Sequence, residues 1–207
     1  MQRQYLPILK RAEQTIRSPK LNAGLPESGF TRSHHRVRIG NGDADYKLVI
    51  SMMRIWKHVE AADWISLHWA KDAVRDYVAM VFRCFLGYAI APFRVHESWS
   101  NLEITGEKNT TILSSGACCA TIVGHFLQAT LVFKAEWERP EGGGDGGDVF
   151  FDIMCDSRPA ASSVISAYPA SYLARLHDVA LEKMCSRMGE VCASARGLRA
   201  SRQHAFR

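Results

Sequence analysis

Cysteine, histidine, serine and acidic side chains are the residues of this 207-residue chain that could do chemistry. Zinc prefers thiolate and imidazole ligands. The available set is Cys118, Cys119 and Cys155 with His96 and His125. No Cys-x-x-Cys or His-x-x-x-His spacing groups them, and buried cysteines usually behave as small apolar side chains. We therefore predict no metal site and no cofactor.

Catalytic arrangements can be written as well, because a nucleophile, a histidine and an acid can converge from any order in a chain. The candidates are Cys118 or Ser115 with His125 and Asp152, and His96 with Glu97 as an acid–base pair. Nothing in the surrounding sequence distinguishes these residues from ordinary strand residues. We therefore predict no catalytic residues and a protein that is not an enzyme.

The glycine run from Gly142 to Gly147 has the composition of a phosphate-binding loop but not its context. No Lys-Ser/Thr pair follows it, and Asp145 and Asp148 would repel a phosphate. The same aspartates are too few for a calcium loop. An acidic hairpin connection is the prediction.

Hydrophobic periodicity predicts the elements that position these side chains. A short strand at Arg36 to Ile39 is followed by helices over Tyr46 to Ala62 and about Lys71 to Ala91, the second ending before Pro92. After Pro92 the period changes to two, as in strands. Strand segments are expected within 93–104, 117–124, 127–137 and 149–155, and a last helix within 169–188.

This order predicts an α+β fold, with a bent antiparallel sheet of four or five strands packed against two or three helices and flexible basic termini. The expected organisation is a basic arm (1–33), one domain (34–188) and a frayed basic tail (189–207). No apolar run is long enough to cross a membrane, and no signal peptide is evident. Six cysteines without a disulfide spacing favour a reducing compartment and argue against secretion.

Charge is segregated along the chain. Met1 to Arg38 carries a net +6, Lys183 to Arg207 a net +5, and the residues between them a net −6. Two cationic ends on an acidic body favour assembly on a polyanion. The predicted polyanion-binding residues are Lys10, Arg11, Arg17, Lys20, Arg32, Arg36, Arg38, Arg196, Arg199 and Arg202.

Aromatic residues alternate with basic ones near the expected helices. Trp56 fits a core stripe, but Trp64 and Trp69, with Lys71, fall in the connection between the helices. Exposed aromatic rings beside cations are typical of a membrane or protein interface. We predict such an interface at these three residues.

The layout resembles the matrix proteins of rhabdoviruses in the order of its elements: a basic arm to Thr31, the strand, the two helices and sheet segments through Asp156. The resemblance implies a structural protein that forms homo-oligomers and bridges a nucleocapsid, through nucleoprotein or RNA, to an anionic membrane. It implies a location in the virion and the host cytoplasm or nucleus, and no small-molecule substrate. No Pro-Pro-x-Tyr or Pro-Thr/Ser-Ala-Pro budding signal is present, which suits a plant-infecting member.

Two other readings stay open. One is a small α+β enzyme or ligand-binding domain whose helices and curved sheet enclose a pocket containing His96, Glu97 or His125. The other is a direct nucleic-acid-binding protein, although no fold signature of that class is recognisable.

Overall fold

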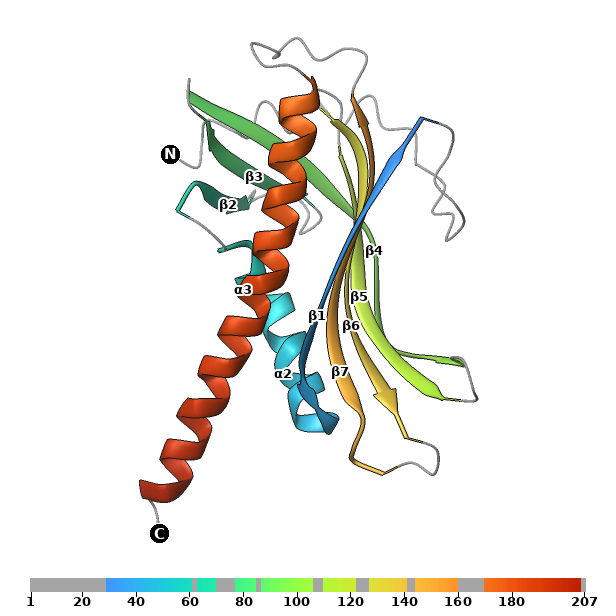
Figure 1. Ribbon diagram of the computed structural model, residues 1–207, viewed down its shortest axis with the longest axis vertical. Helices are drawn as coiled ribbons and strands as arrows, with labels where there is room; N and C mark the ends of the chain where they lie inside the picture. The colour runs from blue at the N-terminus through green and yellow to red at the C-terminus, as the bar shows by residue number, and fades with distance from the viewer. Residues whose placement is uncertain are drawn as a thin grey trace.

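The fold is a curled antiparallel sheet with a long helix across its concave face (Figure 1). The computed structural model describes residues 29–60, 63–69, 77–84, 87–105, 110–121, 127–140, 144–159 and 170–205. Seven strands pair in the order β1-β7-β6-β5-β4-β3-β2. The predicted α+β class and bent antiparallel sheet are confirmed, and the sheet has seven strands rather than four or five.

The element bounds are as follows. The strands are β1 (Thr31–Asn41), β2 (Ile65–Trp69), β3 (Tyr77–Cys84), β4 (Gly87–Thr105), β5 (Thr111–Thr121), β6 (Leu127–Arg139) and β7 (Asp148–Pro159). The helices are α2 (Gly42–Arg54), the short 3-10 helix η3 (Lys57–Val59) and α3 (Ala170–Ala205). The last helix therefore continues through most of the predicted tail.

The helix expected at about 71–91 is wrong where the structure describes it, because β3 and the start of β4 lie there. Val78 pairs with Phe93, and Met80 with Ala91. Successive residues of β3, from Val78 to Phe82, are all buried. A run that is apolar on both faces has no period that separates a strand from a buried helix. Its aromatic and β-branched residues favour the strand.

Strand β4 is one element of 19 residues rather than the two short segments that were expected. Its register with β5 shifts between Val95 and Glu97 and between Trp99 and Leu102. Asn101, within the second irregularity, has φ of 53°. Bulges of this kind bend a strand and increase its twist. The polar stretch therefore curls the sheet instead of interrupting it.

The first predicted helix begins and ends earlier than expected, since α2 stops at Arg54. Trp56 then takes a left-handed conformation with φ of 57°, and η3 follows. This turn changes the direction of the chain. As a result, His58 and Val59 are both buried in the core.

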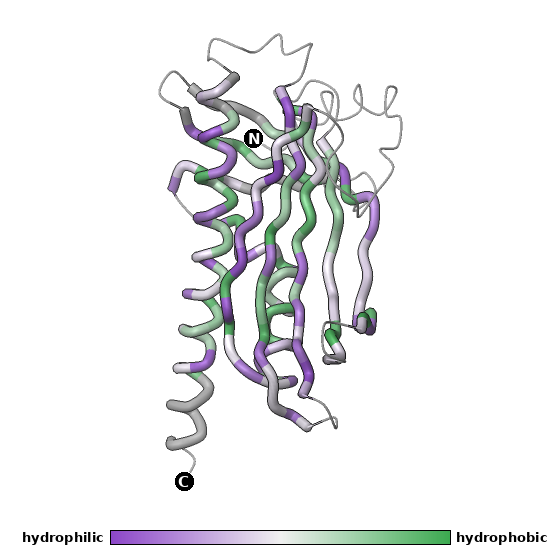
Figure 2. The backbone as a smooth tube through the Cα atoms, turned by 45° about the vertical axis from the view of Figure 1, so that its right-hand side comes forward, coloured by the Kyte–Doolittle hydropathy of each residue, from purple (hydrophilic) through white to green (hydrophobic). Residues whose placement is uncertain are grey.

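The core lies between the concave face of the sheet and α3. Alternate residues of β6 and β7 face inward, and the strands of the sheet carry both hydrophobic and hydrophilic stretches (Figure 2). From the sheet the core takes Leu131, Phe133, Phe151 and Ile153, and from α3 Leu181, Met184, Met188 and Cys192. An antiparallel sheet with one covered face shows this alternation.

The glycine run belongs to the β6–β7 connection and contacts the start of α2. Trp137 Nε1 donates to the Gly146 carbonyl (2.9 Å), and Gly42 N–H donates to the Gly147 carbonyl (2.9 Å). Gly147 has φ of 100°, and a Cβ atom on it would lie 2.0 Å from the Glu138 carbonyl oxygen. The described glycines therefore allow a close backbone approach.

We predict that Gly147→Ala lowers the free energy of unfolding by about 2 kcal/mol or more, because it combines backbone strain with a clash. Gly146→Ala is the matched control, since a Cβ atom there meets nothing within 4 Å. Urea denaturation of both variants is the measurement. Equal stability of the two variants would contradict the close contact between Gly147 and the Glu138 carbonyl.

Candidate functional site

A histidine on η3, packed against the inner face of the sheet, has no hydrogen-bonding partner. His58 is 1% exposed, and neither ring nitrogen has a partner. Its ring stacks on Trp56 (centroids 5.5 Å apart) and lies 4.9 Å from Phe133 and 5.4 Å from Phe151. Burial lowers the pKa of His58 to about 3, so the imidazole is neutral. Buried polar atoms are nearly always paired, so this residue is unusual.

A second buried histidine lies on α3. His177 is 3% exposed, and its Nε2 atom has no partner. Burial lowers the pKa of His177 to about 4, although the neighbouring Asp178 opposes that shift. Asp178 itself bonds His35 of β1 (3.0 Å), which fixes this part of α3 against the edge strand. Neutral imidazoles thus lie on η3 and on the helix that covers the sheet.

Other polar groups of the inner face are satisfied. Ser115 Oγ lies 2.8 Å from the Tyr46 hydroxyl and accepts the Asn101 N–H (2.8 Å). This network ties α2 to the bulge in β4. The contrast with His58 is direct: a buried hydroxyl has two partners, whereas a buried imidazole has none.

The buried histidines make stability depend on pH. Between about pH 3 and pH 6.5 the unfolded chain protonates His58 and the folded chain does not, so stability falls as the pH falls through this range. Each pH unit costs about 1.4 kcal/mol per such histidine. The free energy of unfolding of the wild type falls between pH 6.5 and pH 4.5. We predict that in His58→Phe this fall is smaller by about 2–3 kcal/mol.

Urea denaturation at these two pH values measures the difference between wild type and variant. Groups that titrate equally in both proteins cancel in the comparison. The same loss of stability in both proteins would mean that His58 is hydrated in the folded state.

The outer face of the sheet carries a compact charge cluster on β1, β6 and β7. Asp152, 0% exposed, lies 2.6 Å from His34 Nε2 and 3.0 Å from an Arg36 nitrogen. Arg36 also donates to Glu136 (2.9 Å) and packs over the Phe150 ring (4.0 Å). Two further hydrogen bonds belong to the cluster: Arg36 donates to Glu138, and Lys134 donates to Glu136. Charges from three strands thus neutralise one another.

The two buried carboxylates respond differently. Burial raises the pKa of Asp152 despite the bond from His34 and the charges of Arg36 and Lys134. Burial also acts to raise the pKa of Glu136, but the bond from Lys134 and the charges of Lys134 and Arg36 outweigh it and lower the pKa overall. Glu136 therefore stabilises the fold above its ordinary pKa of 4.5, and that contribution disappears as the pH falls through its folded pKa.

We predict that Glu136→Gln lowers the free energy of unfolding by about 1–2 kcal/mol at pH 7, with a difference that shrinks toward pH 3. Glu138→Gln is the control, because Glu138 bonds the same arginine but is far more exposed and contributes only a few tenths of a kcal/mol. Denaturation curves at both pH values test this. A pH-independent effect of Glu136→Gln would contradict it.

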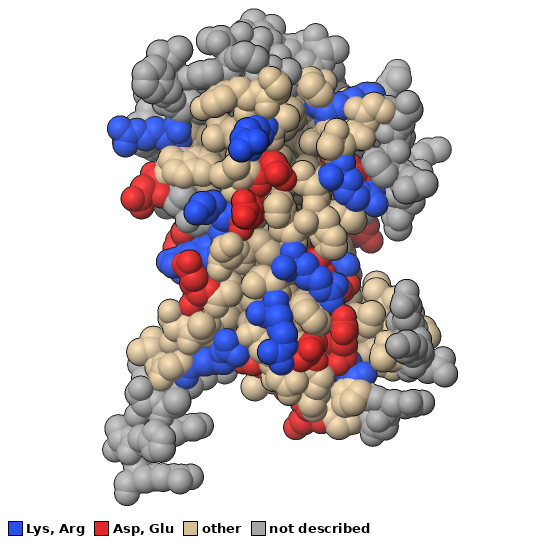
Figure 3. Space-filling model, viewed as in Figure 1, with Lys and Arg blue, Asp and Glu red and all other residues tan. Residues whose placement is uncertain are grey.

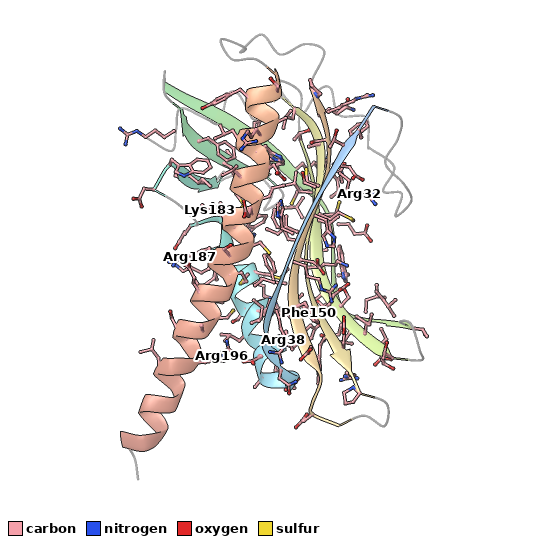
Figure 4. The ribbon with its side chains drawn as sticks, in the orientation of Figure 1. Arg32, Arg38, Phe150, Lys183, Arg187 and Arg196 are labelled. Atoms are coloured by element: carbon pink, nitrogen blue, oxygen red, sulfur yellow. The ribbon has the colours of Figure 1, made fainter. Side chains whose placement is uncertain are left out.

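The described members of the predicted polyanion-binding set contact carboxylates of the same chain. Arg32 pairs with Asp156 (2.7 Å), Arg38 with Asp148 (2.7 Å) and Arg196 with Asp45 (3.2 Å); Arg36 belongs to the cluster above. Figure 4 marks Arg32 and Arg38 along β1 and Arg196 on α3. Basic and acidic side chains lie side by side on this face (Figure 3).

The other members cannot be placed. Lys10, Arg11, Arg17 and Lys20 lie outside the described residues, as do the side chains of Arg199 and Arg202. Binding of an external polyanion by the set stays a prediction.

Of the predicted interface residues, Trp64 packs partly buried against the core, with its ring 6.1 Å from Phe82. The backbone of Trp69 lies in β2, and its side chain lies outside the described part of the chain, as does all of Lys71. The interface itself stays a prediction.

The residues considered for catalysis or metal binding do not converge where they are described. Ser115 faces inward and Asp152 outward, so the sheet separates them. Neighbouring Cys118 and Cys119 point to opposite faces, and burial raises the pKa of both thiols. Glu97 is exposed, His96 is half-buried with a pKa lowered by burial and by Arg94, and His125 lies outside the described residues.

Within the described part of the chain, no three His, Cys, Asp or Glu side chains are grouped to hold a metal ion. The inner histidines were not identified as site residues from sequence. The one available signal was that His58 lies in the sequence between two apolar residues, Trp56 and Val59.

Comparison with known proteins gives one family. The model of the family described as "Domain of unknown function (DUF1990)" matches residues 13–187. No curated protein matches the chain.

Several solved structures are similar in outline. A START superfamily protein from Mycobacterium smegmatis is 10% identical, with a TM-score of 0.47 over 81% of this chain and 99% of that one. Ara h 8.0201 is 8% identical, with a TM-score of 0.45 over 80% and 99%. A hypothetical protein from Helicobacter pylori is 14% identical, with a TM-score of 0.43 over 83% and 95%.

These findings correct the resemblance to rhabdovirus matrix proteins, which is wrong. That resemblance was based on the order of the elements, which included two successive helices, and β3 and the start of β4 lie where the second helix was expected. The matrix function, the nucleocapsid and membrane partners, the self-association and the virion and host location fall with it. The exclusion of a small-molecule ligand is corrected for the same reason. No described helix is long and apolar enough to cross a membrane.

Proposed function

We propose that this chain, which belongs to the DUF1990 family, binds a small apolar molecule between the concave face of its sheet and α3. The observation that carries the proposal is His58, a wholly buried side chain with two unpaired ring nitrogens inside an aromatic cluster. Leaving such atoms unpaired costs about 1–3 kcal/mol. A bound molecule that reaches them would recover that free energy.

The arrangement of the interior supports the proposal. Ligand sites of small domains are concave, lined mainly by apolar and aromatic side chains, and contain few polar groups. Here the inner face presents Leu131, Phe133 and Phe151. His58 contacts the two phenylalanine rings, and His177 on α3 is a second buried histidine with an unpaired atom. The sequence-based alternative of a ligand-binding domain is therefore preferred. Its polar residues differ from those expected, since His58 and His177 replace His96, Glu97 and His125.

Absence of catalysis stays a prediction. The two histidines are buried, and burial lowers the pKa of both rings so that they are neutral. We propose binding without chemical conversion of the ligand.

Fluorescence of the neutral dye N-phenyl-1-naphthylamine tests the proposal. We predict saturable binding of about one dye per folded wild-type chain, because an apolar interior excludes water from the dye. Leu131→Trp fills the inner face and should abolish binding. Val132→Trp changes the adjacent residue, which lies on the outer face and is partly exposed, and should leave binding unchanged.

Overpacking costs about 1–3 kcal/mol, so circular dichroism must first establish that both variants are folded. Failure of the folded wild type to bind the dye, or equal binding by both variants, would overturn the proposal.

A further inference from the structure

We propose that the ligand is an uncharged molecule with an apolar skeleton and a hydroxyl group, and that this hydroxyl group forms a hydrogen bond with one ring nitrogen of His58. The inference rests on the proposed function and names the class of molecule that the same interior takes. Three properties of the interior lead to it: the hydrogen-bonding capacity of the imidazole, the absence of counter-charges, and the aromatic surroundings of the ring.

The hydrogen-bonding capacity comes first. A neutral imidazole has one N–H donor and one acceptor nitrogen. Both nitrogens of His58 are buried and unpaired. A hydroxyl group can donate and accept, so it can pair with the ring in either tautomer, whereas a carbonyl or ether oxygen can only accept. A hydroxyl group is therefore the small polar group that matches His58 best.

Charge excludes two common classes of apolar ligand. No Lys or Arg residue in the described part of the chain is buried as a whole. The buried Nε atom of Arg187 belongs to a side chain that bonds Glu190, and Arg94, whose Nε atom is also buried, lies on the outer face in register with Ala120. A fatty-acid carboxylate would therefore have no fully buried cation among the described residues as its partner. The two buried carboxylates, Glu136 and Asp152, point to the outer face and are paired there. An amine would therefore lack a partner as well. An unpaired charge in an apolar interior is far more costly than an unpaired hydroxyl.

His58 cannot supply the missing charge. Its low pKa, about 3, keeps the ring neutral at physiological pH. His177 is neutral for the same reason. The interior therefore favours neutral ligands over acids and amines.

The surroundings of the ring define the rest of the molecule. Trp56 stacks on one side of His58, and Phe133 and Phe151 lie within 5.4 Å of it, centroid to centroid. Atoms next to the ligand's hydroxyl group would contact these rings and must be apolar. One polar group on a hydrocarbon skeleton is the composition that fits.

Displacement of N-phenyl-1-naphthylamine by decan-1-ol, undecane and decanoate tests the inference. Undecane has the length of the alcohol without its hydroxyl group, and decanoate adds the charge. His58→Phe should weaken decan-1-ol about tenfold, the effect of one lost hydrogen bond, and leave undecane unchanged. His58→Gln keeps a donor and an acceptor and should retain most of the affinity for the alcohol. His34→Phe, the same change on the outer face, should match wild type for all three ligands.

The outcomes separate the two proposals. Equal affinity of wild type and His58→Phe for decan-1-ol, or tighter binding of decanoate than of the alcohol, would overturn this inference and leave the binding function standing. Absence of dye binding would overturn both. If His58→Phe does not fold, the comparison of wild type with His58→Gln and the order of the three ligands decide.

Discussion

Burial of the concave face of the sheet against α3 is the interaction on which the rest of this structure depends. A sheet of this size has one face too apolar to meet water, and α3 covers it together with the shorter α2. The two irregularities in β4 make this possible, because a flat sheet could not wrap around these helices. The network of Tyr46, Ser115 and Asn101 fixes the second bulge to α2, so the curvature and the core support each other.

The outer face of the sheet is held together by ion pairs rather than by apolar contacts with a helix. Strand β1 is at one edge of the sheet, and a row of ion pairs joins it to β7 and β6. The basic residues from Arg32 to Arg38 thus pair with the acidic middle of the same chain. A segregated charge pattern in a sequence therefore has two explanations, and antiparallel pairing of distant strands is the one seen here. An edge strand rich in charge also resists pairing with other chains.

The sequence predicts those elements whose two faces differ. The α+β class, the later strands and the amphipathic part of α3 could be found because polar and apolar positions alternate with a clear period. Strand β3 and the start of β4 could not, since Val78 to Phe82 of β3 are buried on both sides. The site was harder still. His58 enters the core only because α2 ends at Arg54 and Trp56 adopts a left-handed conformation, and no local pattern announces that turn.

The unpaired histidines lower the stability of the fold and are the residues proposed to contact a ligand. A phenylalanine at position 58 would fill similar space among the same aromatic rings without an unpaired donor or acceptor. It would also remove a source of acid sensitivity. His58 lowers the stability of the protein without a ligand, but it would form a hydrogen bond when a ligand is bound. Binding sites commonly hold polar groups that the fold alone does not need. His177 on α3 raises the same question, because its Nε2 atom is also buried without a partner. Under the proposed function, the unpaired nitrogen atoms of His58 and His177 are therefore the groups through which a bound molecule would stabilise the fold.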